Sequence, residues 1–274
     1  MRSWVLTLVL MGTLTAPAHA WHTEYHKLLK DSTLVLEEIL SSADETIPSR
    51  LLSNAKAVIV IPTMLKGGFI FGARYGEGVA SVRNSQTGQW SPPAFITTAG
   101  VSFGFQAGAQ AVDLVLLVMS ERGINGLLRD KFTLGGDIAL TAGPLGRYAE
   151  AGMDLLLQGE IYSYSRSKGL FGGVSLKGTV IQPNEKAIKA YYGSSYTAQE
   201  IMITGNMTHL PPSGLNFIKD MNRLAPPPYN PNLTQLSQAD PADYLSGPQP
   251  GTTPTPTTVS PAGNTGDEPQ GPLW

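Results

Sequence analysis

Three glycine-punctuated apolar blocks lie within residues 66–178 and limit what this chain can fold into. They are KGGFIFGARYGEG at 66–78, TTAGVSFGFQAGAQAVDLVLLVMS at 97–120 and SYSRSKGLFGGVSLKG at 163–178. Glycine weakens helices but suits tight turns and close contacts between strands. The blocks therefore favour an antiparallel, barrel-like sheet over parallel strands joined by crossover helices.

The apolar runs between the glycines predict the individual strands. The run at 57–61 is wholly apolar, and 69–74 and 79–83 are expected to form a hairpin that turns at 75–78. The run at 112–119 is almost wholly apolar, so we expect this strand to be buried on both faces. Further strands are expected at 94–98, 101–106, 133–142, 154–164 and 172–181.

Helical periodicity is clearest at 22–41, where apolar residues recur at intervals of three and four. The polar side of this helix mixes Lys27 and Lys30 with Asp31 and Glu37, whereas a membrane-surface helix has a Lys- and Arg-rich polar face. We therefore expect the helix to pack on the sheet, with membrane contact as the alternative. Shorter helices are expected at 49–55, 121–129, 184–192, 197–203 and 214–224. The prediction is an α+β fold with one domain at 21–224.

Both ends of the chain differ in composition from the predicted domain. Residues 1–20 have the features of a secretory signal peptide, with Arg2, an apolar stretch and an A-x-A cleavage site that ends at Ala20. The chain has no cysteine, so disulfides and a lipoprotein anchor are excluded, and we expect an exported, periplasmic protein. Residues 225–274 are rich in Pro, Thr and Gly and poor in aliphatic residues, which predicts a disordered tail.

Charge and motifs argue against several classes of function. Residues 21–224 contain 18 basic and 17 acidic side chains, so no basic field indicates a nucleic-acid partner. No phosphate-binding loop is present, because Gly76-Glu77-Gly78 lacks the remaining elements of a dinucleotide fingerprint. We expect no cofactor.

The candidates for catalysis or metal binding are isolated. His22 and His26 are four residues apart, but the order H-T-E-Y-H is not that of a zinc protease, so we expect no metal site. No histidine lies in a nucleophile motif, and we expect no enzyme activity. Asp113, within an apolar strand, is expected to form a structural ion pair with an arginine. The sequence Pro226-Pro227-Pro228-Tyr229 matches the P-P-x-Y ligands of WW domains, although chance is the simpler explanation in a proline-rich tail.

The order and spacing of several motifs resemble the SYLF family over about 33–193. The motifs are Ile47-Pro48, AKAVIV at 55–60, KGGF at 66–69, GARYGEGV at 72–79, WSPPA at 90–94, the block at 104–113, LGGD at 134–137, AGPLGR at 142–147, YSYSRSKGLF at 162–171 and Tyr192-Gly193. The resemblance implies a domain that binds membrane lipids, phosphoinositides in eukaryotic members, and actin in fungal ones. Actin binding is not expected for an exported bacterial protein.

The resemblance also suggests residues for a lipid site. Phosphate headgroups bind Arg and Lys presented at turns, with glycine N–H groups nearby. The matching cations are Lys66, Arg74, Arg147, Arg166 and Lys168, for which solvated positions or structural ion pairs are the alternative. Phe69, Leu170 and Phe171 are candidates for membrane contact, with core packing as the alternative. Lys177 stands where family members often have an acid, so the charge here is more basic.

Three functions follow from these observations. The first is a non-catalytic protein of the bacterial envelope that binds anionic phospholipid or the membrane surface. The second is a structural or interaction module that recruits a protein partner. The third is a lipid hydrolase with an unrecognised site. Clustering of the cations on one exposed face would favour the first function, pairing of scattered cations with acids the second, and a buried His–acid pair beside a cleft the third.

Overall fold

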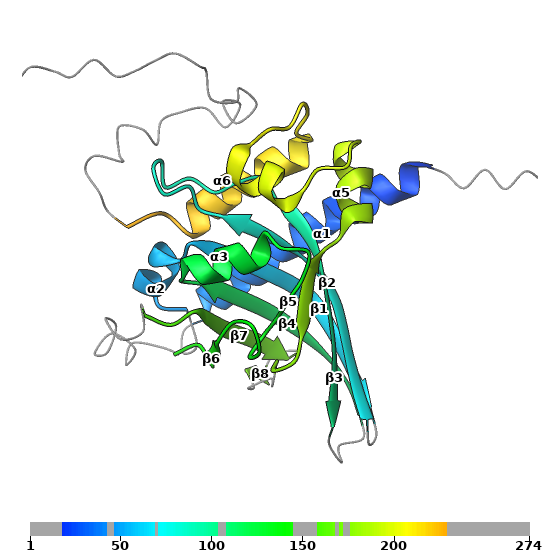
Figure 1. Ribbon diagram of the computed structural model, residues 1–274, viewed down its shortest axis with the longest axis vertical. Helices are drawn as coiled ribbons and strands as arrows, with labels where there is room; N and C mark the ends of the chain where they lie inside the picture. Colours follow the sequence, from blue (N-terminus) through cyan, green and yellow to red (C-terminus); the bar gives the residue numbers. More distant parts are fainter. Residues whose placement is uncertain are drawn as a thin grey trace, which may run out of the picture.

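A computed structural model describes residues 18–42, 47–68, 71–103, 108–144, 158–167, 170–171 and 176–228. The sheet comprises β1 (Ala57–Gly68), β2 (Phe71–Val82), β3 (Ala94–Phe103), β4 (Gly108–Val118), β5 (Phe132–Thr133), β6 (Leu140–Ala142), β7 (Ile161–Ser167), β8 (Leu170–Phe171) and β9 (Val180–Pro183). The helices are α1 (Ala18–Ser41), α2 (Ser49–Asn54), α3 (Glu121–Leu127), α5 (Glu185–Tyr192), the π-helix η2 (Glu200–Thr204) and α6 (Pro212–Leu224). Figure 1 shows the helices gathered around one end of the curled sheet, beyond which the long strands extend.

The strands are ordered β5-β9-β3-β2-β1-β4-β7-β6, with β8 paired to β7. Each of these pairs is antiparallel except β6 with β7. The four longest strands are neighbours in the order β3-β2-β1-β4, and the β1–β2 hairpin turns at one end of the sheet while the β2–β3 hairpin turns at the other. The expected α+β fold with a largely antiparallel, barrel-like sheet is confirmed.

Helix α1 packs on one face of the sheet, which we call the helix face. The ring of Tyr25 lies 5.3 Å from that of Phe95 on β3, and Leu29, Leu36 and Ile39 are buried on the same side of the helix. Phe95 also meets Tyr191 of α5 at 4.9 Å. The expectation that this helix packs on the sheet is confirmed, and the apolar periodicity supplies the physical reason.

Local capping explains where two shorter helices begin and end. The Ser120 hydroxyl accepts a hydrogen bond from the Gly123 N–H at the start of α3, and the Asn184 side chain does the same for Ala187 at the start of α5. Helix α5 ends at Gly193, whose φ of 76° suits a residue without a side chain. Both helices were expected from the sequence.

The predicted hairpin turn at 75–78 is wrong. Residues 75–78 lie inside β2, which runs without interruption, and the β1–β2 hairpin turns between Gly68 and Phe71. Gly76 and Gly78 are needed for close packing: a Cβ at Gly78 would lie 2.3 Å from the Val60 carbonyl oxygen, and one at Gly76 would lie 2.8 Å from Ile61. The prediction attributed these glycines to a turn, whereas the structure requires them for close contact between two strands.

Several other predicted strands have different bounds. The segment at 94–98 and the described part of 101–106 belong to a single strand, β3, and 133–142 contains the end of β5, β6 and the turn between them. The part of 154–164 that the structure describes as strand begins at Ile161. The predicted signal peptide up to residue 17 and the tail from Tyr229 lie outside the described residues.

Strand β1 contains a bulge at Thr63. The pairing with β4 shifts between Ile61 and Met64, and Thr63 has a φ of 62°, in the left-handed region that β-branched residues rarely adopt. Its N–H donates to Oδ1 of Asp113 on the neighbouring strand at 3.0 Å. A side chain from β4 therefore compensates the backbone group that the bulge removes from the ladder.

Candidate functional site

An exposed apolar surface covers the far end of β1 to β4, where the strands extend beyond the helices (Figure 1). We call this part of the sheet the ribbon end. Two cross-strand rows lie on its helix face, since they alternate in phase with Phe95. The first row is Ala111, Leu65, Tyr75 and Ala99; the second is Ala109, Gly67, Ala73 and Val101.

The side chains of these rows are unusually exposed for their chemistry. Val101 is 73% exposed, Leu65 58% and Tyr75 51%. Among the described side chains, the other large hydrophobic residues with comparable exposure are Leu34 and Ile203, which lie elsewhere. An apolar patch of this kind on a folded domain marks an interaction surface.

The opposite face of the ribbon end is polar. Lys66 pairs across the strands with Arg74 on one side and Gln110 on the other. Arg74 is only 4% exposed: its side chain lies over Gly100, and its Nη2 donates to the carbonyls of Val101 at 3.1 Å and Lys177 at 3.4 Å. Burial lowers the pKa of Arg74. The Arg74 guanidinium thus binds backbone carbonyls. Lys66 is half-buried.

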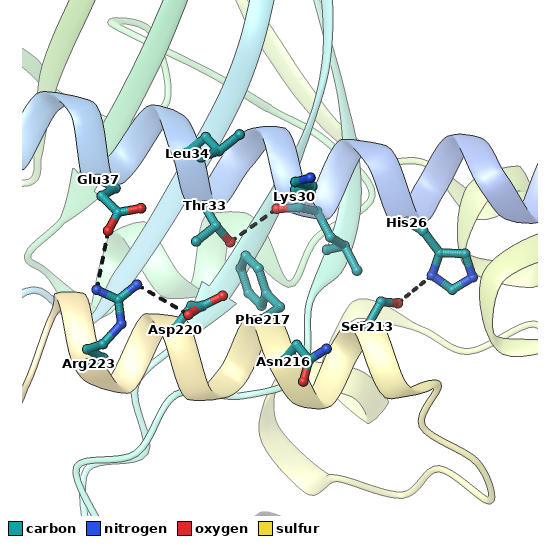
Figure 2. A pocket seen from close by; sticks show the side chains of 11 residues that line it. His26, Lys30, Thr33, Leu34, Glu37, Ser213, Asn216, Phe217, Asp220 and Arg223 are labelled. Carbon is teal, nitrogen blue, oxygen red and sulfur yellow. Dashed lines mark hydrogen bonds and ion pairs between the residues drawn. The ribbon is translucent and has the colours of Figure 1, made fainter.

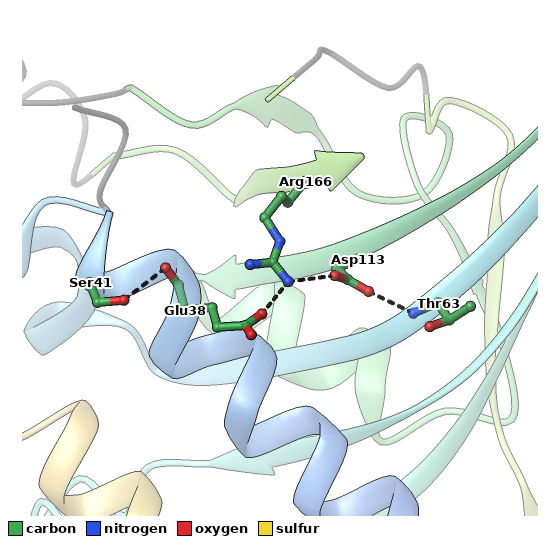
Figure 3. Close-up of polar contacts among 5 residues, drawn as sticks. All are labelled: Glu38, Ser41, Thr63, Asp113 and Arg166. Atoms are coloured by element: carbon green, nitrogen blue, oxygen red, sulfur yellow. Dashed lines mark hydrogen bonds and ion pairs between the residues drawn. The ribbon is translucent and has the colours of Figure 1, made fainter. Parts of the chain in front are cut away.

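A charged network marks where α1 stops covering the helix face (Figure 3). Arg166 Nη2 donates to Oδ2 of Asp113 at 3.0 Å and to Oε2 of Glu38 on α1. Burial lowers the pKa of Arg166, but the hydrogen bonds to Asp113 and Glu38 outweigh it, so the pKa lies above the ordinary value. Since Asp113 also holds Thr63, the network joins α1 to the bulge from which the ribbon end begins. The expected structural ion pair between Asp113 and an arginine is confirmed.

A groove of about 410 Å³ separates α1 from α6 (Figure 2). At one end, the Ser213 hydroxyl lies 2.5 Å from Nδ1 of His26 and 2.6 Å from the Tyr191 hydroxyl. Two acids, Glu37 and Asp220, line the other end and both bind Arg223. These contacts hold the two helices together, and within the groove both acids bind Arg223 and neither is paired with His26.

Within the described parts of the chain, no three His, Asp or Glu side chains come together as metal ligands would. None of the helices in those same parts combines the length and apolarity needed to cross a bilayer.

Comparison with known proteins places this architecture in a family. Residues 99–223, which run from the second half of β3 through β4 to the last turn of α6, match the Ysc84 family, described as Las17-binding protein actin regulator. Ysc84 and SYLF are names of the same domain family. The chain carries a domain of the SYLF family. The resemblance expected from the sequence motifs is therefore confirmed.

Relatives of this SYLF domain occur in fungi and mammals. Protein YSC84 of Saccharomyces cerevisiae is 38% identical over 174 residues, which are 62% of this chain and 36% of that protein. LAS seventeen-binding protein 3 of the same yeast is 37% identical over 186 residues, 64% of this chain and 40% of that protein. SH3 domain-containing YSC84-like protein 1 of Homo sapiens is 30% identical over 177 residues, 64% of this chain and 51% of that protein. The chain thus matches about half or less of each relative.

The three predicted cations that the structure describes do not lie together on one exposed face. Lys66 and Arg74 are neighbours on one side of the sheet, whereas Arg166 lies on the helix face with its acids. Arg147, Lys168 and Phe69 lie outside the described residues. Leu170 and Phe171 form β8, with their side chains outside the description.

Sequence reasoning missed the apolar residues Leu65, Tyr75 and Val101. They stand in strands whose alternation looks like that of a core, so their sequence alone predicts burial. A signal was nevertheless present for Val101, since no charged residue occurs at 84–112, whereas Leu65 and Tyr75 stand next to Lys66 and Arg74. Exposed strands normally carry charged side chains that keep the protein soluble, so a long exposed stretch without charges suggests an interaction surface.

Proposed function

We propose that this SYLF domain is a non-catalytic membrane-binding module that inserts its ribbon end into the surface of a lipid bilayer. The observation that carries the proposal is the pair of exposed apolar rows on the helix face, with Val101 73% and Leu65 58% exposed. These side chains gain nothing from water, and a bilayer offers them an apolar environment.

The dimensions of the ribbon end suit this role. From the Leu65–Tyr75 pair to the Gly68–Gly72 pair the hairpin advances three residues, about 10 Å at about 3.3 Å per residue. Interfacial protein elements bury their apolar surfaces about 5–10 Å into the headgroup and acyl boundary. Lys66, one residue nearer the turn than Leu65 but on the opposite face, has a long side chain that can extend its ammonium back to the headgroups.

The energetic gain is large enough for reversible binding. Full burial of a valine or leucine side chain contributes about 1.5–3 kcal/mol. Even partial burial of the two exposed rows in a bilayer would therefore contribute several kcal/mol to the binding free energy. A single myristoyl chain, with about 0.8 kcal/mol per buried CH₂, also gives reversible binding only. We therefore expect association that a second signal or a high local membrane concentration would strengthen.

The family supports a binding role rather than catalysis. The names of the relatives describe binding and SH3 domain-containing proteins, and the matched family is described as an actin regulator. Those partners belong to the relatives. For this chain, the signal-like residues 1–20 lead us to propose an exported protein of the cell envelope, where the inner or outer bilayer is the available lipid surface.

The test is flotation of the purified chain from Trp21, without the apolar leader, on vesicles of bacterial phospholipid. We expect the protein to float with the vesicles and Val101→Asp to reduce the bound fraction about tenfold or more, because a charge would have to be buried with the strand. Leu65→Asp should behave in the same way.

Ile203→Asp is the matched control. Ile203 is also exposed, at 46%, but it lies beside Val82, at the other end of β2 from the ribbon end. This variant should float as the wild type does. Equal loss of binding in the Val101 and Ile203 variants would place the contact elsewhere, and a wild-type protein that binds no vesicle would refute the proposal.

A second candidate function, recruitment of a protein partner, has an observation of its own. The Ala225 carbonyl accepts hydrogen bonds from Arg83 at 2.9 Å and from Trp90 Nε1 at 2.8 Å, so the position from which Pro226-Pro227-Pro228-Tyr229 follows is fixed. Anchored proline segments are suitable ligands for aromatic grooves. Titration of the chain with an isolated WW domain, compared with the Pro227→Ala variant, would test this candidate.

A further inference from the structure

We infer that the start of the C-terminal tail, residues 229–233, docks on the domain in a groove of about 480 Å³, with the Tyr229 ring against Ile203. Residues of α2, α3 and η2 line this groove, together with Val82 at the end of β2. The groove therefore lies at the other end of β2 from the ribbon end, and the inference is independent of the proposed membrane function.

The first reason is the place where the described chain ends. Pro228 is the last described residue and itself lines the groove. The segment before it is held in place, because the Ala225 carbonyl accepts hydrogen bonds from Arg83 Nη2 at 2.9 Å and from Trp90 Nε1 at 2.8 Å. Three prolines follow, and their fixed φ angles limit the directions in which the chain can continue. Tyr229 is therefore joined to the chain at the edge of the groove.

The second reason is the apolar lining of the groove. Ile203 is 46% exposed, and Ile124 and Met202 line the same groove. An exposed isoleucine gains free energy when an apolar side chain covers it. Tyrosine supplies a large apolar ring with a polar tip, which suits a groove that is lined by apolar side chains and open to water.

The third reason is charge. The charged groups of the groove have partners within the domain: Lys56 pairs with Glu121, and Arg83 donates to the carbonyls of Leu52, Ala55, Gly88 and Ala225. Residues 229–239 contain no charged side chain. An uncharged segment can therefore cover the groove without leaving a buried charge unpaired.

The entropic cost of this contact is small. Tyr229 follows Pro228 directly, so no loop has to close before the ring reaches the groove. A separate molecule with the same ring would also lose its translational and rotational freedom on binding. The groove is therefore filled by the tail of its own chain in preference to an external ligand.

Docking of Tyr229 has a consequence for the second candidate function. The sequence Pro226-Pro227-Pro228-Tyr229 matches a WW ligand only with its tyrosine. One ring cannot occupy the groove and a WW domain at the same time, so the groove limits access to the motif.

The test is NMR spectroscopy of the chain from Trp21 with labelled isoleucine methyl groups. An aromatic ring that packs on a methyl group shifts the resonance of that group, so we expect the Ile203 resonance to move in Tyr229→Ala. Tyr244→Ala is the matched control, because Tyr244 belongs to the same tail but lies farther along the chain. This variant should leave the Ile203 resonance unchanged.

Chymotrypsin, which cleaves after tyrosine, gives a second readout at the same residue. Docking protects the bond after Tyr229, so cleavage there should be severalfold faster in Ile203→Asp, which places a charge against the ring. Val101→Asp is the matched control, since it makes the same kind of change at an exposed residue of the ribbon end. It should leave the cleavage rate at Tyr229 unchanged.

Two results would overturn the inference. The first is an Ile203 resonance that does not move in Tyr229→Ala, or a cleavage rate at Tyr229 that Ile203→Asp does not change. The second is a difference between the wild type and Tyr229→Ala that disappears when the protein is diluted, because the ring would then come from the tail of a second copy. Neither result affects the vesicle flotation that tests the proposed function.

Discussion

Phe95 and Val101 lie on the same face of the same strand, six residues apart, yet one is fully buried and the other is 73% exposed. Around Phe95, α1 and α5 provide Tyr25 and Tyr191 as a second layer. Around Val101 the described structure provides none. The strands repeat the same apolar alternation in both regions, so burial here depends on whether a helix covers the sheet.

This difference separates residues that maintain the fold from residues that are free to serve another purpose. Removing an apolar side chain from the covered region should destabilise the domain, whereas removing one from the ribbon end should change only what the domain binds. The following predictions test that separation.

The largest effect is expected for Phe95→Ala. The change deletes a ring that contacts Tyr25 and Tyr191 and leaves a cavity, so the free energy of unfolding should fall by about 3–5 kcal/mol. Chemical denaturation measures it. A loss below about 1 kcal/mol would show that the two regions differ less than their burial indicates.

Alkaline pH should also act on the covered region. Burial raises the pKa of Tyr191 to about 12, although hydrogen bonds from Ser213 and Gly214 lower it in part. The unfolded tyrosine loses its proton near pH 10. The stabilising contribution is therefore complete below pH 10 and is lost as the pH rises to about 12, by at most about 2.7 kcal/mol.

The variant Tyr191→Phe isolates that contribution. Its unfolding free energy should depend less steeply on pH between about 10 and 12, by up to about 1.4 kcal/mol per pH unit. An unchanged slope would mean that Tyr191 does not titrate differently in the folded and unfolded states.

At the boundary between the two regions, Asp113→Ala should cost about 1–3 kcal/mol. The change removes a partner of Arg166 and leaves the Thr63 N–H without its acceptor. Thermal denaturation of Lys27→Ala is the comparison, because that lysine is 74% exposed and its pair with Asp31 should contribute less than about 0.5 kcal/mol. Equal effects would remove any special role for the network.

The smallest effect on stability is expected for Val101→Ser. Because the side chain is mostly exposed, the unfolding free energy should change by less than about 0.5 kcal/mol. A change of about 2 kcal/mol or more would indicate that the ribbon end is covered in solution.

The sequence was sufficient for the parts of the fold that follow from local rules. Apolar periodicity located α1, the helices expected at 121–129 and 184–192 correspond to α3 and α5, and the isolated Asp113 was correctly expected to pair with an arginine. Each of these inferences needs only neighbouring residues or a single charge that cannot be buried alone.

Other features depend on distant parts of the chain. Gly76 and Gly78 resemble turn residues until Val60 and Ile61 are placed against them. Arg74 resembles a ligand-binding cation until the carbonyls of Val101 and Lys177 are found around it. The exposure of Val101 follows from where α1 crosses the sheet, at Phe95 on β3 and at Asp113 on β4, because the strands extend past this crossing.

The bulge at Thr63 has a consequence for the chemistry of the ribbon end. Side chains of a regular strand alternate between the two faces, so a ladder that continued unshifted from the Val60–Val79 pair would turn Leu65 to the opposite face and place Lys66 on the helix face, opposite Ala73. The one extra residue reverses the alternation, so the Lys66 ammonium group lies on the face opposite the apolar rows. Asp113 accepts the hydrogen bond of the Thr63 N–H and so stabilises the bulge. A residue outside the ribbon end therefore helps to determine which face of the hairpin is apolar and which is charged.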